Sequence, residues 1–279
     1  MNRILISALL VVGFIADSQA FREFSCEFKS DGIFEAKVEQ SLLRLEEMPH
    51  TYFDDCDDAL NKGFNKTGVY RIKPKASFRP FKVWCDMESD GGGWINIQTR
   101  FDGLVDFYRT WQEYRNGFGS VDSEHWLGNN YIHQITRNND FELKIELTGF
   151  DEDEFATAKY SPFQIGTEDD KYRLNIGNFT GDGVITDSLS GHNGFMFTTK
   201  DNDNDIWPNN CADLAQGAWW YHRCYSSNLN GLWMSEERSK AVRGPQSNEN
   251  VVGKIWSGAF NVGFYSLKSV EMKVRRIRS

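Results

Sequence analysis

A short segment between residues 200 and 233 contains carboxylates, cysteines and tryptophans at close spacing. Asp201, Asp203 and Asp205 alternate with other residues, and carboxylates on one tight loop are typical ligands of calcium. The spacing resembles the start of an EF-hand loop, but Ile206 replaces its glycine and Ala212 its final glutamate. The segment is therefore either a calcium loop of another kind or a solvated acidic loop.

Trp219 and Trp220 lie between Cys211 and Cys224. A tryptophan pair beside cysteines favours the core, although a ligand platform remains the alternative. The chain has five histidines, and none lies in a His-Glu-x-x-His motif or accompanies a Gly-x-Ser-x-Gly motif. We therefore expect a non-enzymatic protein.

The five cysteines indicate an oxidising compartment. Four of them allow three pairings, of which the local pairs Cys56–Cys85 and Cys211–Cys224 are the simplest. No Cys-x-x-Cys motif supports zinc. Cys26 is left over, and it is either a free thiol or a bridge that makes a disulfide-linked homo-oligomer.

The first twenty residues have the pattern of a secretory signal peptide. Arg3 precedes an apolar run at residues 4–15, and small residues stand at 18 and 20. We divide the chain into a signal peptide (1–20), an N-terminal segment (21–51) and one domain (52–279), and we expect secretion to the extracellular space. Asn65 and Asn178 begin glycosylation sequons.

The net charge of −9 makes the chain a poor ligand for nucleic acid or an anionic membrane. It is compatible with calcium and with neutral sugars. No later segment is long and apolar enough to span a membrane.

Periodicity in residues 21–51 predicts an amphipathic helix, with Phe34, Val38, Leu42 and Leu45 on one face and Pro49 as its end. Such a helix either oligomerises or packs on its own domain.

From residue 52 onwards the pattern predicts mostly short strands. Residues 68–72 and 81–85 look extended, and apolar residues alternate around 143–147 and 270–274. A triple glycine before Trp94 predicts a turn that opens another strand. We expect one helix from 106 to a C-cap at Gly117 and a shorter one near 131–136. Residues 160–265 read as a loop-built part held by disulfides and metal.

Ten segments in order resemble the fibrinogen C-terminal domain family, which includes ficolins, tachylectins and angiopoietins. The resemblance covers about residues 52 to 279. The segments read DDCDDAL, GVYRIKP, FKVWCDMESDGGGW, FDGLVDFYRTWQEYRNGFG, EHWLGNNYIHQIT, YRLNIGNFTGD, DNDND, NCA, WWYHRCYSSNLNG and YSLKSVEMKVR.

The resemblance implies an α+β fold with a central twisted antiparallel sheet and a loop-rich C-terminal subdomain, and it supports the two local disulfides. It implies a calcium site made by the Asp203 and Asp205 carboxylates and the backbone carbonyls of Trp207 and Asn209. So few carboxylates suggest a dissociation constant of about 10⁻⁴ to 10⁻³ M.

The resemblance also implies a cis peptide at Arg223–Cys224, beside a small pocket that binds an acetyl group in the lectin members. In this chain Cys224, Tyr225, Trp220, Asn250 and Val251 are the matching ligand-binding candidates, with backbone N–H groups of Cys224 and Tyr225 as donors.

Several pocket positions depart from the lectin pattern. Tyr225 replaces the usual histidine, Ala215 replaces an aromatic residue, and Val251 stands where alanine is usual. Leu214 and Ala215 also fall where fibrinogen has a polar pair. The resemblance therefore supports the calcium loop of this chain more strongly than it supports the ligand.

Two functions follow from the resemblance. The first is a secreted, calcium-binding lectin that recognises N-acetylated glycans in innate defence. The alternative is an angiopoietin-like or matrix-type protein that binds a receptor or another extracellular protein, which the altered pocket favours.

Overall fold

The computed structural model describes residues 52–138, 140–241, 253–260 and 266–278 of the chain. By its internal contacts the chain divides into Met1–His50 and Thr51–Ser279, and the described residues all belong to the second unit. The predictions for the signal peptide, for the 21–51 helix with Cys26, and for Asn250 and Val251 lie outside the described residues.

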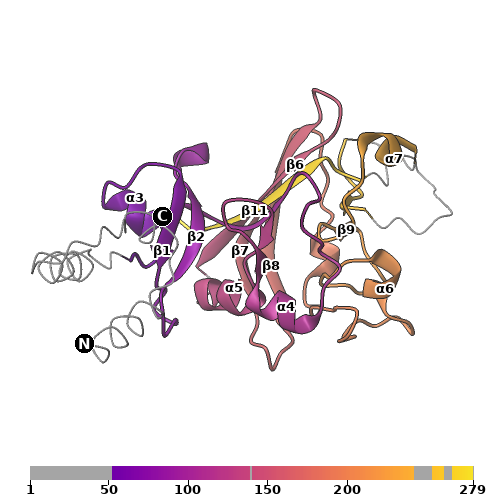
Figure 1. Ribbon diagram of the computed structural model, residues 1–279, viewed down its shortest axis with the longest axis horizontal. Helices are drawn as coiled ribbons and strands as arrows, with labels where there is room; N and C mark the ends of the chain where they lie inside the picture. The colour runs from indigo at the N-terminus through magenta and orange to yellow at the C-terminus, as the bar shows by residue number, and fades with distance from the viewer. Residues whose placement is uncertain (1–51, 139, 242–252, 261–265, 279) are drawn as a thin grey trace, which may run out of the picture. The chain divides into compact units, whose positions relative to one another are not determined.

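One nine-stranded antiparallel sheet organises the described chain (Figure 1). Its main order is β1-β2-β3-β11-β6-β7-β8, while β5 pairs with β3 and with β4. The strands are β1 (Gly68–Ile72), β2 (Phe81–Asp86), β3 (Trp94–Arg100), β4 (Phe118–Gly119), β5 (His125–Trp126), β6 (Phe141–Thr148), β7 (Phe155–Ile165), β8 (Leu174–Asp182) and β11 (Ser269–Arg276). The strands predicted near 68–72, 81–85, 94, 143–147 and 270–274 are confirmed.

The last strand, β11, lies in the middle of the sheet between β3 and β6. Because successive side chains of a strand point to opposite faces of the sheet, the apolar residues of β11 share the face that lies on the core. Met272 pairs with Ile145 and Val270 with Leu147, and all four side chains are buried. The C-terminal segment therefore joins the N-terminal strands to the rest of the sheet.

Three helices accompany the sheet: α3 (Cys56–Asn61), α4 (Trp111–Asn116) and α5 (Asn129–Thr136). The predicted C-cap at Gly117 is confirmed, with φ of 87°. The predicted start at residue 106 is wrong, because the Glu113 carboxylate accepts hydrogen bonds from the Thr110 N–H (2.9 Å) and hydroxyl (2.7 Å) and so starts the helix there. Phe107 is still buried, but from the preceding loop.

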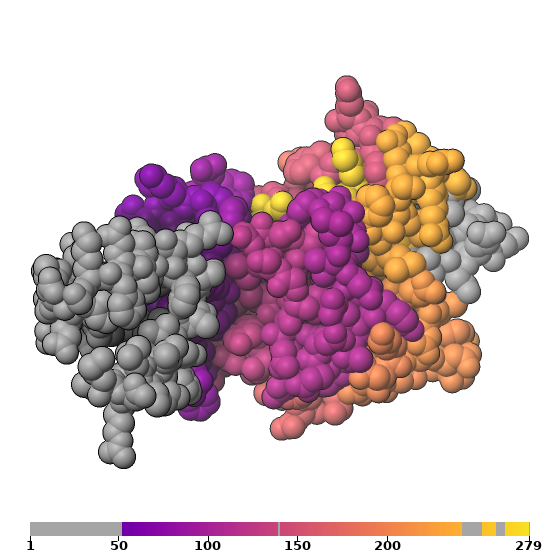
Figure 2. Space-filling view, viewed as in Figure 1, coloured from indigo at the N-terminus to yellow at the C-terminus, as the bar shows by residue number. Residues whose placement is uncertain are grey.

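The prediction of a loop-built part at residues 160–265 is wrong for residues 160–182, because β7 and β8 occupy most of that range. The described residues from 183 to 268 are rich in loops, and the segment around residues 200–240 is orange in the space-filling view (Figure 2). Their elements are η3 (Ser190–His192), α6 (Cys211–Ala215), β9 (Ser227–Asn228), α7 (Glu236–Ala241) and β10 (Ile255–Trp256), with β9 and β10 forming a separate small sheet. The predicted disulfides Cys56–Cys85 and Cys211–Cys224 are both confirmed. The second closes the loop that contains Trp219 and Trp220.

Candidate functional site

The predicted calcium ligands lie on one loop before α6. The Asp205 carboxylate accepts hydrogen bonds from the N–H groups of Trp207 (2.8 Å) and Cys211 (2.9 Å), and Asp203 accepts one from the N–H of Asp205 (3.2 Å). Burial raises the pKa of Asp205 and the nearby Asp203 carboxylate raises it further, against the opposing effect of those backbone donors. The loop therefore holds the carboxylates of Asp203 and Asp205 close together.

The neighbouring Asp201 has a different role. Its carboxylate accepts hydrogen bonds from the Trp111 N–H (2.8 Å) and from the Thr199 hydroxyl (2.8 Å), so it ties the loop to the start of α4. Of the three alternating aspartates, only Asp203 and Asp205 are therefore available to bind a cation.

The oxygen atoms around Asp205 fit calcium. Within the described residues, the backbone carbonyls of Trp207 and Asn209 accept no hydrogen bond, so both remain free to coordinate. No cluster of three or more His, Cys, Asp or Glu side chains suited to a metal occurs in the described chain. A cation here would therefore combine two carboxylates with carbonyls, which are ligands that calcium accepts. The site remains a prediction.

The residues predicted to bind an acetyl group divide into three groups. The Arg223–Cys224 peptide is cis, as predicted, and Cys224 and Tyr225 are half-buried. Burial raises the pKa of the Tyr225 hydroxyl to about 12. Trp220 is 0% exposed and its indole N–H donates to the Tyr172 carbonyl (2.7 Å), so its predicted ligand contact is corrected to a core position. Asn250 and Val251 lie outside the described residues.

His192 organises the same region of the chain. This fully buried ring donates from Nδ1 to the Trp220 carbonyl (2.8 Å) and accepts at Nε2 from the N–H groups of Ser226 (3.1 Å) and Ser227 (3.2 Å). Burial lowers its pKa to about 4, which keeps the imidazole neutral. His192 therefore braces the segment that follows Cys224. It lies in no motif or periodic pattern, so only the folded chain identifies it.

A group of exposed apolar side chains lies beside the end of β3. We call it the apolar patch, and it comprises Phe101 (45% exposed), Leu104 (85%) and Trp233 (36%). The Trp233 indole N–H donates to the Phe101 carbonyl (3.3 Å). Gly103 lies against the Trp233 ring, and a Cβ at that glycine would come within 2.6 Å of it. The 101–104 loop and Trp233 therefore form one surface.

A buried carboxylate fixes that loop. Glu124 is 0% exposed, and its Oε1 accepts hydrogen bonds from the N–H groups of Phe101 (2.7 Å), Asp102 (3.2 Å) and Gly103 (3.1 Å). Its Oε2 accepts one from Val105 (3.0 Å). Burial works to raise the pKa of Glu124, but these donors outweigh it and lower the pKa. The loop is thus held in one conformation.

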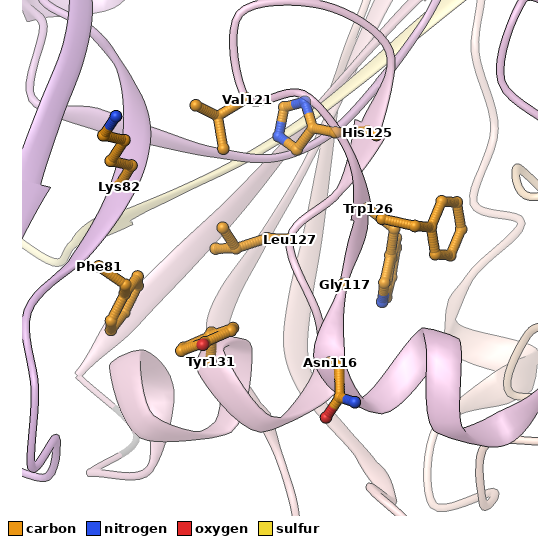
Figure 3. A pocket seen from close by; sticks show the side chains of 11 residues that line it. Phe81, Lys82, Asn116, Gly117, Val121, His125, Trp126, Leu127 and Tyr131 are labelled. Carbon is orange, nitrogen blue, oxygen red and sulfur yellow. The ribbon is translucent and has the colours of Figure 1, made fainter. Parts of the chain in front are cut away.

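A cavity of about 270 Å³ lies between β2 and β5 (Figure 3). These strands pair with different parts of the same β3 edge, β2 with residues 94–96 and β5 with 98–99. Phe81 and Tyr131 close one side with ring centroids 4.4 Å apart, and Leu127 and His125 lie across from them. The described lining contains no carboxylate or thiol. The cavity could hold a partner's side chain but offers no partner for histidine-based catalysis.

The model of the family described as fibrinogen beta and gamma chains, C-terminal globular domain, matches residues 52–277. The chain belongs to this family. Fibrinogen-like protein 1 of Rattus norvegicus is 42% identical over 238 residues, covering 80% of this chain and 72% of that protein. The Mesocricetus auratus protein of the same name is 41% identical over 237 residues, covering 80% and 71%.

Solved structures give the same result. The fibrinogen-like globe domain of human ANGPTL2 is 37% identical with a TM-score of 0.73, covering 80% of this chain and 99% of that one. That of human ANGPTL6 is 38% identical with a TM-score of 0.73, covering 83% and 98%. Lamprey fibrin D-dimer, solved with the peptide ligand Gly-His-Arg-Pro-amide, is 27% identical with a TM-score of 0.71, covering 99% and 92%.

These relatives support the alternative function better than the lectin. The predicted family and α+β fold are confirmed. No catalytic family is indicated among the relatives described above. Their names give no support to a lectin, to calcium binding or to innate defence.

Proposed function

We propose that this protein is a secreted, non-enzymatic binding protein whose fibrinogen-type domain recognises an extracellular protein partner. The relatives named fibrinogen-like protein 1 and the ANGPTL globe domains support this function, and lamprey fibrin was solved with a bound peptide. Fibrinogen-like proteins are generally secreted, and residues 1–20 carry the predicted signal peptide. Among the described residues, no helix is long and apolar enough to cross a membrane.

The observation that carries the proposal is the apolar patch. Phe101 and Leu104 are exposed on a loop that the buried Glu124 carboxylate holds in place, and the exposed Trp233 donates a hydrogen bond to the Phe101 carbonyl of that loop. Large aromatic side chains dominate the binding energy of protein interfaces. A rigid loop also loses little conformational entropy when a partner binds. The patch therefore has the composition and the rigidity of an interface centre.

The test is a binding screen of the secreted protein against individually expressed extracellular protein domains. Leu104→Asp should reduce binding of the partner that is found at least 10-fold, since a charge in an apolar interface centre must be desolvated. Val184→Asp is the matched control, because Val184 is also exposed (50%) but lies outside the apolar patch. Equal losses in both variants would contradict the patch assignment.

A glycan array with and without EDTA runs in parallel. Binding to N-acetylated glycans that requires calcium, together with no binding to any protein domain, would overturn the proposal in favour of the lectin.

We also propose that Asp203, Asp205 and the carbonyls of Trp207 and Asn209 hold one calcium ion. Support comes from the free carbonyl oxygens and from the raised pKa of Asp205. The bound ion would neutralise the two carboxylates and so stabilise the loop before α6.

A further inference from the structure

One stretch of the chain has a charge opposite to that of the whole. Residues 62–82 contain seven Lys or Arg and no Asp or Glu. Because this stretch contributes +7 to a net charge of −9, the rest of the chain carries −16. We call the stretch the basic hairpin, since it contains β1, the connection to β2 and the first two residues of β2. Its cations are Lys62, Lys66, Arg71, Lys73, Lys75, Arg79 and Lys82.

Most of these cations are available to a partner. Lys66, Arg71, Lys75 and Arg79 are exposed, and none of them forms an ion pair with another described residue. Lys62 differs, because it pairs with Asp58 at 2.8 Å. By contrast, the cations at the end of β11 and after it are each paired with carboxylates. Lys66, Arg71, Lys75 and Arg79 thus carry charge that no ion pair within the described part of the chain compensates.

The strand register brings like charges together. Arg71 on β1 lies directly opposite Lys82 on β2, and both are exposed. Like charges directly opposite on one face of a sheet destabilise the pairing. A bound anion would remove this repulsion.

The connection between the strands is compact and projects an aromatic ring. Pro74 and Pro80 restrict its backbone, and the Ser77 N–H donates to the Pro74 carbonyl (2.7 Å) in a turn. Phe78 between them is 98% exposed. The base of the hairpin is fixed by the Cys56–Cys85 disulfide and by pairing of β2 with β3. Its cations therefore occupy a preorganised frame.

Edge protection does not account for this charge. β1 is the edge strand of the sheet, and lysines on an edge strand prevent pairing with other chains. However, Lys75 and Arg79 lie in the connection between Ile72 and Phe81, beyond both strands. These two cations do not face a free strand edge.

We propose that the basic hairpin binds a linear sulfated polysaccharide. The proposal relies on the extracellular location in the proposed function, but not on the apolar patch. Clusters of Lys and Arg are typical of patches that bind polyanions such as heparin. The cations are spread from the residues before β1, through the connection, to the start of β2 rather than gathered at one point, which suits a linear polyanion with repeating charges.

The net negative charge of the chain does not prevent this binding. Charges more than a Debye length apart, about 8 Å at physiological salt, are largely screened. The indigo surface that contains the basic hairpin lies away from the orange surface of the acidic loop in Figure 2. Anionic lipid is a weaker candidate, since the strong negative potential belongs to the cytoplasmic leaflet.

The experiment titrates the full secreted protein with size-defined heparin oligosaccharides, using two matched triple variants. The hairpin variant is Arg71→Gln, Lys75→Gln and Arg79→Gln. The control variant is Arg137→Gln, Arg238→Gln and Lys268→Gln, which neutralises three other exposed cations without ion pairs among the described residues. Both variants change the net charge equally, and thermal melting checks that both fold.

The hairpin variant should weaken heparin binding about 100-fold at physiological salt, while the control variant stays within about 3-fold of wild type. The slope of log affinity against log salt should decrease in magnitude by about 2 to 3 in the hairpin variant, because fewer counterions are released. Hyaluronan, which carries carboxylates without sulfate, should bind much more weakly than heparin.

Three results would overturn the proposal. One is no heparin binding by wild type at physiological salt, and another is an equal loss in both variants. The third is binding to phosphatidylserine vesicles in preference to heparin, with Phe78→Ala abolishing it, which would assign the hairpin to membranes. None of these results affects the protein-partner screen, which contains no heparin.

Discussion

The basic hairpin and the loop-rich part use their side chains in opposite ways. In the hairpin, β1 and β2 satisfy each other's backbone, and charged side chains are left exposed. In the loop-rich part the elements are short, and buried side chains bond to backbone groups instead. His192 and Asn228 are both examples, since Asn228 donates to the carbonyls of Ala215 and Gly253 (3.3 Å each).

This difference follows from where backbone hydrogen bonds are made. Buried backbone groups must be paired, either within a sheet or by side chains. A regular hairpin therefore leaves its outer side chains free to bind a partner. In a loop-built region many polar and aromatic side chains stabilise the region itself. Fewer of them are therefore available to bind a ligand.

The largest expected effect compares two aromatic residues. Trp220→Ala in the loop-rich part should lower the free energy of unfolding by about 3–5 kcal/mol, because it leaves a cavity in a fully buried site. Phe78→Ala in the basic hairpin should change it by less than about 0.5 kcal/mol, because that ring is 98% exposed. Urea unfolding measures both, and comparable losses would break the contrast.

Acid should weaken the loop-rich part through His192. The pKa of His192 is about 4 in the folded chain, against an ordinary histidine value of about 6.5, so the unfolded chain takes up the proton first as the pH falls. The neutral ring's contribution is complete above about pH 6.5 and is lost towards pH 4. Between pH 7 and pH 5 the loss is about 2 kcal/mol.

His192→Gln is the matched variant, because an amide can also donate and accept hydrogen bonds without titrating. Its stability should fall less between pH 7 and pH 5 than that of wild type, as measured by urea unfolding at both values. Parallel pH profiles for the two proteins would rule out this role of His192.

Calcium should stabilise the loop-rich part without changing the hairpin. At a calcium concentration of about ten times the dissociation constant, binding adds about 1.4 kcal/mol to the free energy of unfolding. Asp203→Asn should remove this gain, whereas Asp201→Asn should keep it, because Asp201 bonds to Trp111 and Thr199 instead. The measurement is the melting temperature with calcium and with EDTA. An equal melting temperature of the wild-type protein in both would disprove the site.

The smallest expected effect is a gain in the hairpin. Arg71→Gln removes a like charge opposite Lys82 and should raise the free energy of unfolding by about 0.2–1 kcal/mol. Arg137→Gln, which also removes an exposed cation, should leave it unchanged. A loss of stability in Arg71→Gln would show that the register pair is not repulsive.

Local pattern predicted the sheet better than the helix ends. The alternation at Leu143, Ile145 and Leu147 identified β6, since one face of a strand must be buried. The start of α4 was placed too early, because Phe107 matches the helical spacing but belongs to a loop. The capping contacts of Thr110 and Glu113 compete with that spacing and decide the start.

Site residues were predictable only where a motif places them. The cysteine spacing led to both disulfides, and the family resemblance led to the cis peptide at Arg223–Cys224. Trp220 was placed in a ligand pocket, but burial puts it in the core. The net charge of −9 concealed the basic hairpin, because an average over the chain says nothing about where charges collect.

By itself, the sequence determined the family, the strands with clear alternation, both disulfide pairs and the position of the acidic loop. These depend on neighbouring residues or on a motif read in order. Only the tertiary structure decided that β11 lies in the middle of the sheet, that Glu124 fixes the loop of the apolar patch, and that Arg71 faces Lys82. Each of these results from residues brought together by strand register and packing, and no local pattern encodes such contacts.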